Sequence, residues 1–262
     1  MILERFSEGS SPLHRIDPRV KVCIALPLVF VVALSNRVVL SNTVVLSNRY
    51  GAILLGLVGA LFLLFYARIA LKAVIQSLRV LLLFILLLWI FLPLSMQGDT
   101  LFHLGPLAFT QEGIHRALSI SLKSSVIVLY IISLISTSTV FSVVHALHHL
   151  KVPRKLVYLA FLSYRYIQVI HEEYLTLKNA MKIRGFRPKT DGHTYRSYAY
   201  LAGMLIVRSY DRAERIHEAM LLRGFHGEFY LLHHFSIGKR DILFALFMSI
   251  YIFGIVCLEW IL

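Results

Sequence analysis

The chain has 262 residues, of which 58% are hydrophobic and only 16% are charged, and its mean hydropathy is +0.72. Soluble domains have about 45–50% apolar and about 25% charged residues, so this composition excludes an ordinary soluble protein. The formal net charge is nevertheless +13. Lys and Arg collect in the cytoplasmic loops of membrane proteins. A nucleic-acid-binding protein would be basic without needing long apolar runs, so we expect a membrane protein with no nucleic-acid partner.

Five apolar runs predict transmembrane helices, at residues 20–34, 50–67, 78–95, 117–140 and 241–261. About 20 residues are needed to cross a hydrocarbon core of about 30 Å, so the first run is short. Three copies of a six-residue unit follow it, at 34–39, 40–45 and 46–51. An additional short helix in these repeats would raise the number of spans from five to six.

Most of the basic residues beside the span ends lie on one side. Eight of them lie next to the ends that we expect in the cytoplasm: Arg15, Arg19, Lys21, Arg68, Lys72, Arg79, Lys239 and Arg240. The loop at 96–116 contains one basic residue, Arg116. The positive-inside rule therefore predicts a multi-pass protein of the cell (inner or plasma) membrane, with its N-terminus in the cytoplasm and its C-terminus outside.

Residues 141–240 differ from the rest of the chain because they hold 16 of its 27 Lys and Arg. Apolar residues recur there at helical spacing from Pro153 to Gly185 and again over 195–223, which predicts two long amphipathic helices. We divide the chain into an N-terminal membrane region (1–140, about four spans), a cytoplasmic region (141–240) and a last transmembrane helix (241–262). The expected fold is an all-α integral membrane protein of five to six spans with these two cytoplasmic helices.

Both amphipathic helices end in nearly the same seven residues, AMKIRGF at 180–186 and AMLLRGF at 219–225. Gly just past a helix adopts φ > 0, and a basic last turn suits the helix dipole, so capping explains part of the repeat. A guanidinium held at a rigid helix end can also make forked hydrogen bonds to a partner, which Lys cannot copy. We favour partner docking over capping alone. The candidate contact residues are Ala180, Met181, Arg184, Gly185, Phe186, Ala219, Met220, Arg223, Gly224 and Phe225.

These repeated ends resemble the two Arg-centred motifs of the transmembrane (T) component of energy-coupling factor (ECF) transporters. The stretches IDPRVK (16–21), SYRYI (163–167) and VRSY (207–210) are also similar to that family. The resemblance is strongest to its cobalt/nickel CbiQ-type branch. The chain departs from many members in the six-residue repeats and in having Ile183 and Leu222, rather than Ala, directly before the Arg.

The resemblance implies a coupling scaffold of an ECF-type ABC importer for cobalt or nickel. Its partners would be two ATP-binding cassette ATPases, which engage the repeated ends, and a separate substrate-specific membrane subunit. ATP would bind to the ATPases, and this chain would be neither an enzyme nor the holder of a cofactor. It has no Gly-rich phosphate loop that ends in Lys-Ser or Lys-Thr.

Other functions stay open at this stage. A vitamin-type substrate subunit is an alternative to a metal-specific one. A self-sufficient secondary transporter would need repeated spans and polar midplane residues, and neither is visible. A membrane-bound enzyme would need a nucleophile–base pair or a metal cluster, and an anchor for anionic lipid would need a basic stripe without interspersed acids.

Twelve histidines raise the question of a metal site. His145, His148 and His149 precede the first amphipathic helix, and His233 and His234 precede the last span. His145 and His149 are one helical turn apart, which suits a metal, but no cysteine accompanies them. We expect solvated interfacial histidines and no metal site on this chain.

Lys123 and the two cysteines of the chain lie within predicted spans. Lys123 lies inside the fourth span and is expected either to extend to the outer interface or to pair within the helix bundle. Cys23 and Cys257 make no disulfide framework, and we expect both to be small buried hydrophobic residues.

Overall fold

The computed structural model describes residues 11–35, 51–69, 71–96, 100–104, 107–150, 152–225 and 238–261. It divides into two compact units. The membrane unit is Met1–Ala146 with Phe235–Leu262, and the helix-pair unit is Leu147–His234. Apart from one two-stranded hairpin, the regular structure of the described residues is helical, which confirms the predicted all-α membrane fold.

Five helices of the membrane unit correspond to the five predicted spans. They are α1 (Pro18–Leu34), α2 (Gly51–Ala67), α3 (Leu71–Ser95), α4 (Gln111–Leu134) and α8 (Lys239–Ile261). Among the described residues, three segments are long and apolar enough to cross a membrane: Val74–Ser95, Gln111–Leu134 and Lys239–Leu258. α1 and α2 have 17 residues each, at the lower end of spanning lengths. Residues 36–50, which hold most of the six-residue repeats, lie outside the described part of the chain.

The predicted bounds of the fourth span, 117–140, are wrong by about two turns. α4 begins at Gln111 because Glu112 and its polar neighbours fit the solvated first turns of a helix. It ends at Leu134, before the sequence STST at 136–139, whose hydroxyls compete for backbone hydrogen bonds. The chain then resumes as a separate short helix, α5 (Val140–His149), which the sequence analysis did not predict.

A hairpin joins α3 to α4, within the segment for which the sequence predicts only a loop (96–116). Its strands, β1 (Thr100–Leu104) and β2 (Leu107–Thr110), pair antiparallel. Thr110 occupies the N-cap position of α4 without a side-chain capping bond, and its hydroxyl donates instead to the Pro93 carbonyl of α3 at 3.2 Å. A Cβ on Gly113 would come within 2.6 Å of Pro93 Cα. The end of α3 and the start of α4 are therefore in close contact beside the hairpin.

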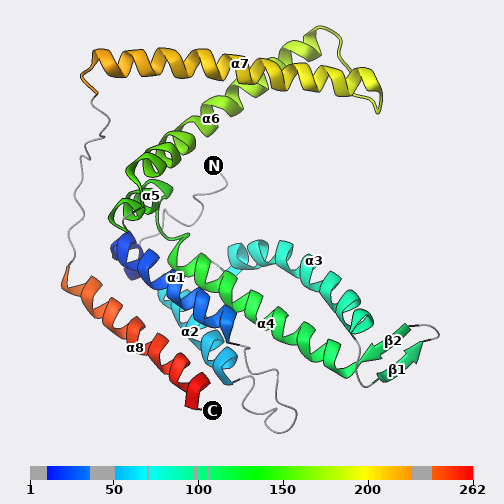
Figure 1. Cartoon of the computed structure of the whole chain (residues 1–262), viewed down its shortest axis with the longest axis vertical. Helices are drawn as coiled ribbons and strands as arrows, with labels where there is room; N and C mark the ends of the chain where they lie inside the picture. Colours follow the sequence, from blue (N-terminus) through cyan, green and yellow to red (C-terminus); the bar gives the residue numbers. More distant parts are fainter. Residues whose placement is uncertain are drawn as a thin grey trace. The chain divides into compact units, whose positions relative to one another are not determined.

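α4 is the central helix of the membrane unit and contacts α1, α2 and α3 (Figure 1). Its fully buried Tyr130 donates a hydrogen bond to the Gly56 carbonyl of α2 at 2.6 Å. Tyr251 of α8 donates to the Leu55 carbonyl, also at 2.6 Å, and the two tyrosine oxygens lie 3.2 Å apart. A Cβ on Gly59 would overlap the Tyr251 hydroxyl. Small residues of α2 thus admit tyrosines from two other helices.

Lys123 reaches another helix of the bundle. Its Nζ lies 3.5 Å from the Ala33 carbonyl, close to the C-terminal end of α1. That end of a helix carries a partial negative charge, so a cation is favourable there. In the predicted topology this is the outer end of α1, so the contact fits both alternatives for Lys123.

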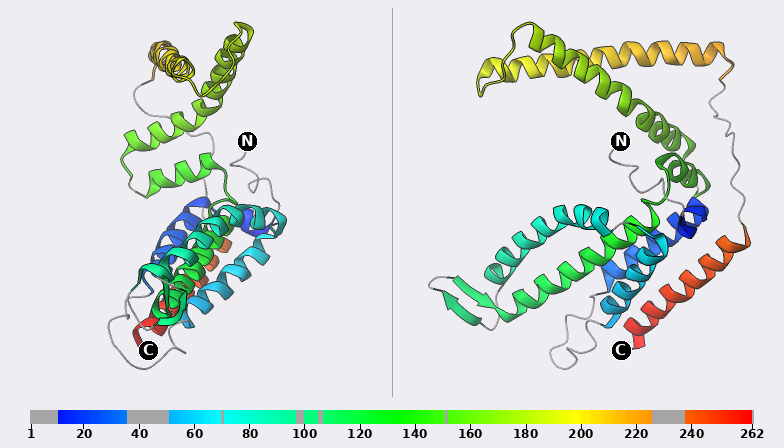
Figure 2. Two further views of the ribbon diagram at one scale, coloured as in Figure 1. Left: turned by 90° about the vertical axis from the view of Figure 1, so that its right-hand side faces the viewer. Right: turned by 180° about the vertical axis from the view of Figure 1, so that it is seen from behind.

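The helix-pair unit contains the two predicted amphipathic helices, α6 (Arg154–Ile183) and α7 (Gly192–Leu222). Pro153 is the N-cap of α6 rather than part of its first turn, and α7 begins three residues earlier than predicted. The helices cross, and their C-terminal ends lie at opposite ends of the pair (Figures 1 and 2). Phe186, after α6, packs edge-on against Tyr198 of α7 with ring centroids 5.7 Å apart. The connection is thereby packed against the start of α7.

Candidate functional site

The repeated end of α6 is a complete C-terminal cap. Arg184 is the C-cap residue, and Gly185 follows it with φ of +82°. The Gly185 N–H donates to the Lys182 carbonyl at 3.0 Å, and the Phe186 N–H donates to the Met181 carbonyl at 3.1 Å. This pair of bonds is the Schellman motif, which satisfies carbonyls that a helix end would otherwise leave unpaired.

The repeated end of α7 has the same geometry. Arg223 is the C-cap, and Gly224 has φ of +77°. The Gly224 N–H donates to the Leu221 carbonyl at 2.9 Å, and the Phe225 N–H donates to the Met220 carbonyl at 3.0 Å. The repeated sequence is therefore a repeated local structure, and we call these two ends the Arg tips.

Equivalent residues of the two copies make equivalent backbone hydrogen bonds. The Ala180 carbonyl accepts the Arg184 N–H at 3.2 Å, and the Ala219 carbonyl accepts the Arg223 N–H at 3.3 Å. A Cβ on either glycine of the tips would meet nothing within 4 Å, so positive φ, and not lack of space inside the chain, requires glycine there.

Each Arg tip presents a cation next to an apolar side chain. Arg184 and Arg223 are both exposed. Ile183 is 87% exposed and Leu222 is 89% exposed. Many members of the family that the chain resembles have Ala at these two positions. The structure does not bring the two tips together, because they lie at opposite ends of the crossed helices (Figure 1).

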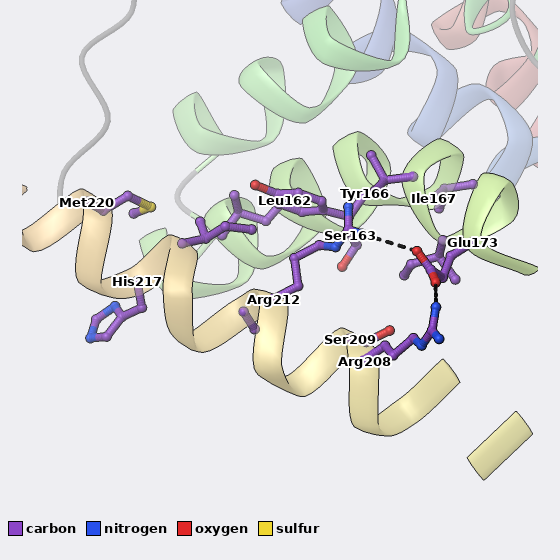
Figure 3. Close-up of a pocket in the computed structure, with 14 residues that line it drawn as sticks. Leu162, Ser163, Tyr166, Ile167, Glu173, Arg208, Ser209, Arg212, His217 and Met220 are labelled. Carbon is purple, nitrogen blue, oxygen red and sulfur yellow. Dashed lines mark hydrogen bonds and ion pairs between the residues drawn. The ribbon is translucent and has the colours of Figure 1, made fainter. Parts of the chain in front are cut away.

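A groove of about 490 Å³ lies between α6 and α7 (Figure 3). Most of its lining is apolar and comes from both helices: Leu162, Tyr166, Ile167, Val169, Ile170, Ala213, Ile216 and Met220. Glu173, Arg208 and Arg212 contribute the charged part of the lining. The two helices are therefore not in tight contact along this side of their crossing.

One carboxylate links the two helices beside this groove. Glu173 of α6 forms ion pairs with Arg208 and Arg212 of α7, the second with 3.3 Å between Oε2 and Nη2 (Figure 3). The sequence analysis missed this contact, although the repeat contains a signal for it. Glu173 and Arg212 are 39 residues apart, which is also the offset between Arg184 and Arg223. The ion pair thus joins equivalent positions of the two helices, each 11 residues before its Arg tip, about 16 Å along the helix.

The expectation of solvated histidines is wrong for His145. Its side chain is only 8% exposed, and its Nε2 lies 3.3 Å from Nη2 of Arg19. α5 begins a new helix after the STST break, and this places His145 against the start of α1. The side chains of His148 and His149, and all of residues 226–237, lie outside the described part of the structure. Among the residues described, no group of three or more His, Cys, Asp or Glu could hold a metal ion.

The two cysteines are not both buried. Cys23 is exposed on α1, and Cys257 is half-buried on α8. The expectation is therefore wrong for Cys23, since an apolar helix in a membrane can present any of its faces to lipid.

Comparison with known proteins extends over most of the chain. Residues 9–233 match the family model described as cobalt transport protein, CbiQ. The energy-coupling factor transporter transmembrane protein of Streptococcus equi subsp. equi is 27% identical over 239 residues, 87% of this chain and 84% of that protein. The protein of the same name from Bacillus subtilis is 24% identical over 238 residues, 87% of this chain and 85% of its own length.

A similar relative is found in an archaeon. An uncharacterized protein of Methanocaldococcus jannaschii is 24% identical over 256 residues, which cover 96% of this chain and 90% of the relative. The match to the family model includes all of α1 to α7 and both Arg tips. The chain therefore belongs to the cobalt transport protein (CbiQ) family and is a transmembrane component of an energy-coupling factor transporter.

Proposed function

We propose that this chain is the coupling scaffold of an importer in which two ATP-binding cassette ATPases dock on the Arg tips. The observation that carries the proposal is the duplication itself. Two helices of one unit end in the same cap, and each cap presents an exposed Arg beside an exposed apolar residue. A pair of equal sites fits a pair of similar partners, and Arg suits forked hydrogen bonds to carboxylates or carbonyls.

Movement would pass from the ATPases to the membrane through the helix pair. α6 has 30 residues and α7 has 31, so each is a lever of about 45 Å. Their link at Glu173 joins the levers at matching distances from the two tips. ATP would be bound and hydrolysed by the partners alone, and a separate membrane subunit would capture the substrate.

Cobalt or nickel is the cargo that we favour. The matching family model is described as cobalt transport protein, whereas the names of the Streptococcus and Bacillus relatives specify no cargo. A vitamin-type substrate subunit is the second candidate, since the Arg tips would serve either. Among the described residues, no group of three or more His, Cys, Asp or Glu could hold such an ion, and this supports a proposed substrate site on another subunit.

The helix-pair unit and the N-terminus would lie in the cytoplasm, where the ATPases are. The asymmetry of Lys and Arg beside the span ends supports this orientation. The C-terminus of α8 would then lie outside.

Replacing both tip arginines tests the docking proposal. We expect Arg184→Ala with Arg223→Ala to abolish transport and release the ATPases, because losing one partner of a buried charge contact costs roughly 2–5 kcal/mol. Either change alone should have a smaller effect, and Arg→Lys should also impair transport because the forked geometry is lost. Co-purification of the ATPases and transport are measured together. Arg215→Ala, at an exposed Arg of α7, is the control. If the double variant transports normally, the two tips are helix caps and not docking sites.

Glu173 tests transmission between the levers. The ion pairs of Glu173 with Arg208 and Arg212 are partly exposed to solvent. Such pairs contribute only about 0–1 kcal/mol to stability, so Glu173→Gln should fold. We expect it to widen the distribution of distances between spin labels at positions 183 and 222 and to lower the substrate moved per ATP. Glu172→Gln is the matched control, because the Glu172 side chain accepts a hydrogen bond only from Gln168 of its own helix among the bonds that the structure records. Equal distance distributions in the two variants would contradict this role.

The proposed location of the substrate site predicts weak metal binding by this chain. The purified chain, without a tag, should bind Co²⁺ or Ni²⁺ no better than scattered surface imidazoles. Equilibrium titration measures this, and His148→Gln with His149→Gln should change it little. Stoichiometric submicromolar binding that the double variant loses would make this chain part of the metal path.

The orientation is tested by labelling single cysteines in whole cells. Cys23 and Cys257 are replaced by Ala, and a cysteine is introduced at the exposed His193 or Glu112. A reagent that does not cross membranes should label position 112 in intact cells and position 193 only after lysis. Labelling of position 193 in intact cells would reverse the proposed topology.

A further inference from the structure

The motif IDPRVK at 16–21 has no part in the Arg tips, yet its polar side chains make long-range contacts. The chain leaves the membrane unit after Ala146 and returns to it at Phe235. The contacts of the motif fall on residues 137–145, just before the exit, and on Asp241, just after the return. All of these residues belong to the membrane unit.

Asp17 and Asp241 bind the start of α1 to the start of α8. Asp17 caps α1, and its Oδ1 accepts the Arg19 N–H at 2.9 Å. The Asp17 N–H in turn donates to Oδ1 of Asp241 at 3.0 Å, and Oδ2 of Asp241 accepts the Gly238 N–H at 2.8 Å. Both carboxylates are buried, with 6% and 7% exposure. The return segment is therefore fixed at its first turn.

Lys21 and Arg19 bind the exit segment. Lys21 is 1% exposed, and its Nζ donates to Oγ1 of Thr137 at 3.2 Å and to Oγ of Ser138 at 2.9 Å. These hydroxyls lie in the break between α4 and α5. Arg19 reaches His145 in α5 at 3.3 Å. A guanidinium only donates, so this hydrogen bond requires Nε2 of His145 to be the acceptor.

Because Lys21 is buried, it depends on contacts with both segments. A buried charge is costly unless it is paired and hydrogen-bonded, so Lys21 requires both its hydroxyl acceptors and nearby negative charge. The carboxylates of Asp17 and Asp241 supply that charge. The exit and return segments thus satisfy the same lysine, one by hydrogen bonds and the other by charge.

We propose that Asp17, Arg19 and Lys21 form a clamp that holds the exit and return segments together, so that motion of the helix-pair unit reaches α4 and α8 as one movement. This inference rests on the proposed coupling function. Without the clamp, the STST break and the start of α8 would each absorb motion separately. These three residues are positioning residues and contact neither ATP nor cargo.

The test uses the full chain in its complex, with Lys21→Met and Asp241→Asn as variants. Met keeps most of the buried volume of Lys, and Asn keeps one acceptor for the Asp17 N–H. Lys72→Met, at an exposed position in the first turn of α3, is the matched control. The first measurement is the distance distribution between spin labels at positions 141 and 240 in the chain alone. The second is co-purification of the ATPases together with substrate moved per ATP hydrolysed.

We expect the label distances to widen in both variants while the ATPases stay bound, because the Arg tips are intact. Substrate moved per ATP should fall about tenfold, the size of change usual for residues that couple two sites. An unchanged transport ratio, or unchanged label distances, would overturn the clamp.

Two outcomes separate this inference from the proposed function. If the unmodified chain binds no ATPase, the docking proposal fails, and the label distances alone then decide the clamp. If Lys21→Met does not fold, Ser138→Ala, which removes one acceptor of Lys21, takes its place with the same two measurements. A Ser138→Ala variant that matches the Lys72→Met control in both would also overturn the clamp.

Discussion

The membrane unit depends on the close approach of two tyrosines to the backbone of α2. In a bilayer, apolar side chains gain little by leaving lipid for another helix, so association relies on tight packing and interhelical hydrogen bonds. Tyr130 of α4 and Tyr251 of α8 both donate to carbonyls of α2, and glycine at position 59 leaves the room for them. These two hydrogen bonds therefore join α2, α4 and α8 at one point of the membrane unit.

Around this point, the helices differ in how much other helices of the chain cover them. In α4, 44% of the residues in its most apolar 18-residue stretch are buried, whereas in α3 the corresponding share is 6%. The exposed apolar side chains of α3 must be covered by lipid or by another chain. The proposed scaffold would need such a surface for a separate membrane subunit, and the more buried α4 does not provide one.

The two units also use charge in different ways. Lys21, Asp17 and Asp241 are buried, so each must keep its partners, and the arrangement is specific. Glu173 and its two arginines are partly solvated, so the link between α6 and α7 is weak enough to yield while still favouring one crossing. This contrast fits the proposed coupling role, in which the membrane unit keeps its contacts while the two helices of the helix-pair unit move.

The sequence by itself determined the features that depend on neighbouring residues. Composition decided the membrane environment, helical spacing decided the two amphipathic helices, and Arg-Gly-Phe decided both caps, because a Schellman cap needs only a glycine at positive φ and a few adjacent backbone groups. The end of α4 was misplaced because hydroxyl-rich STST interrupts a helix without interrupting the apolar run.

Only the tertiary structure decided which distant residues meet. Asp17 and Asp241 are 224 residues apart, Lys21 and Ser138 are 117 apart, and Glu173 and Arg212 are 39 apart. Periodicity reports which face of a helix is apolar, but not which helix that face contacts. In lipid, shape and a few polar groups make that choice, so the burial of His145 and the contacts of Asp17 and Lys21 depend on how the helices pack together.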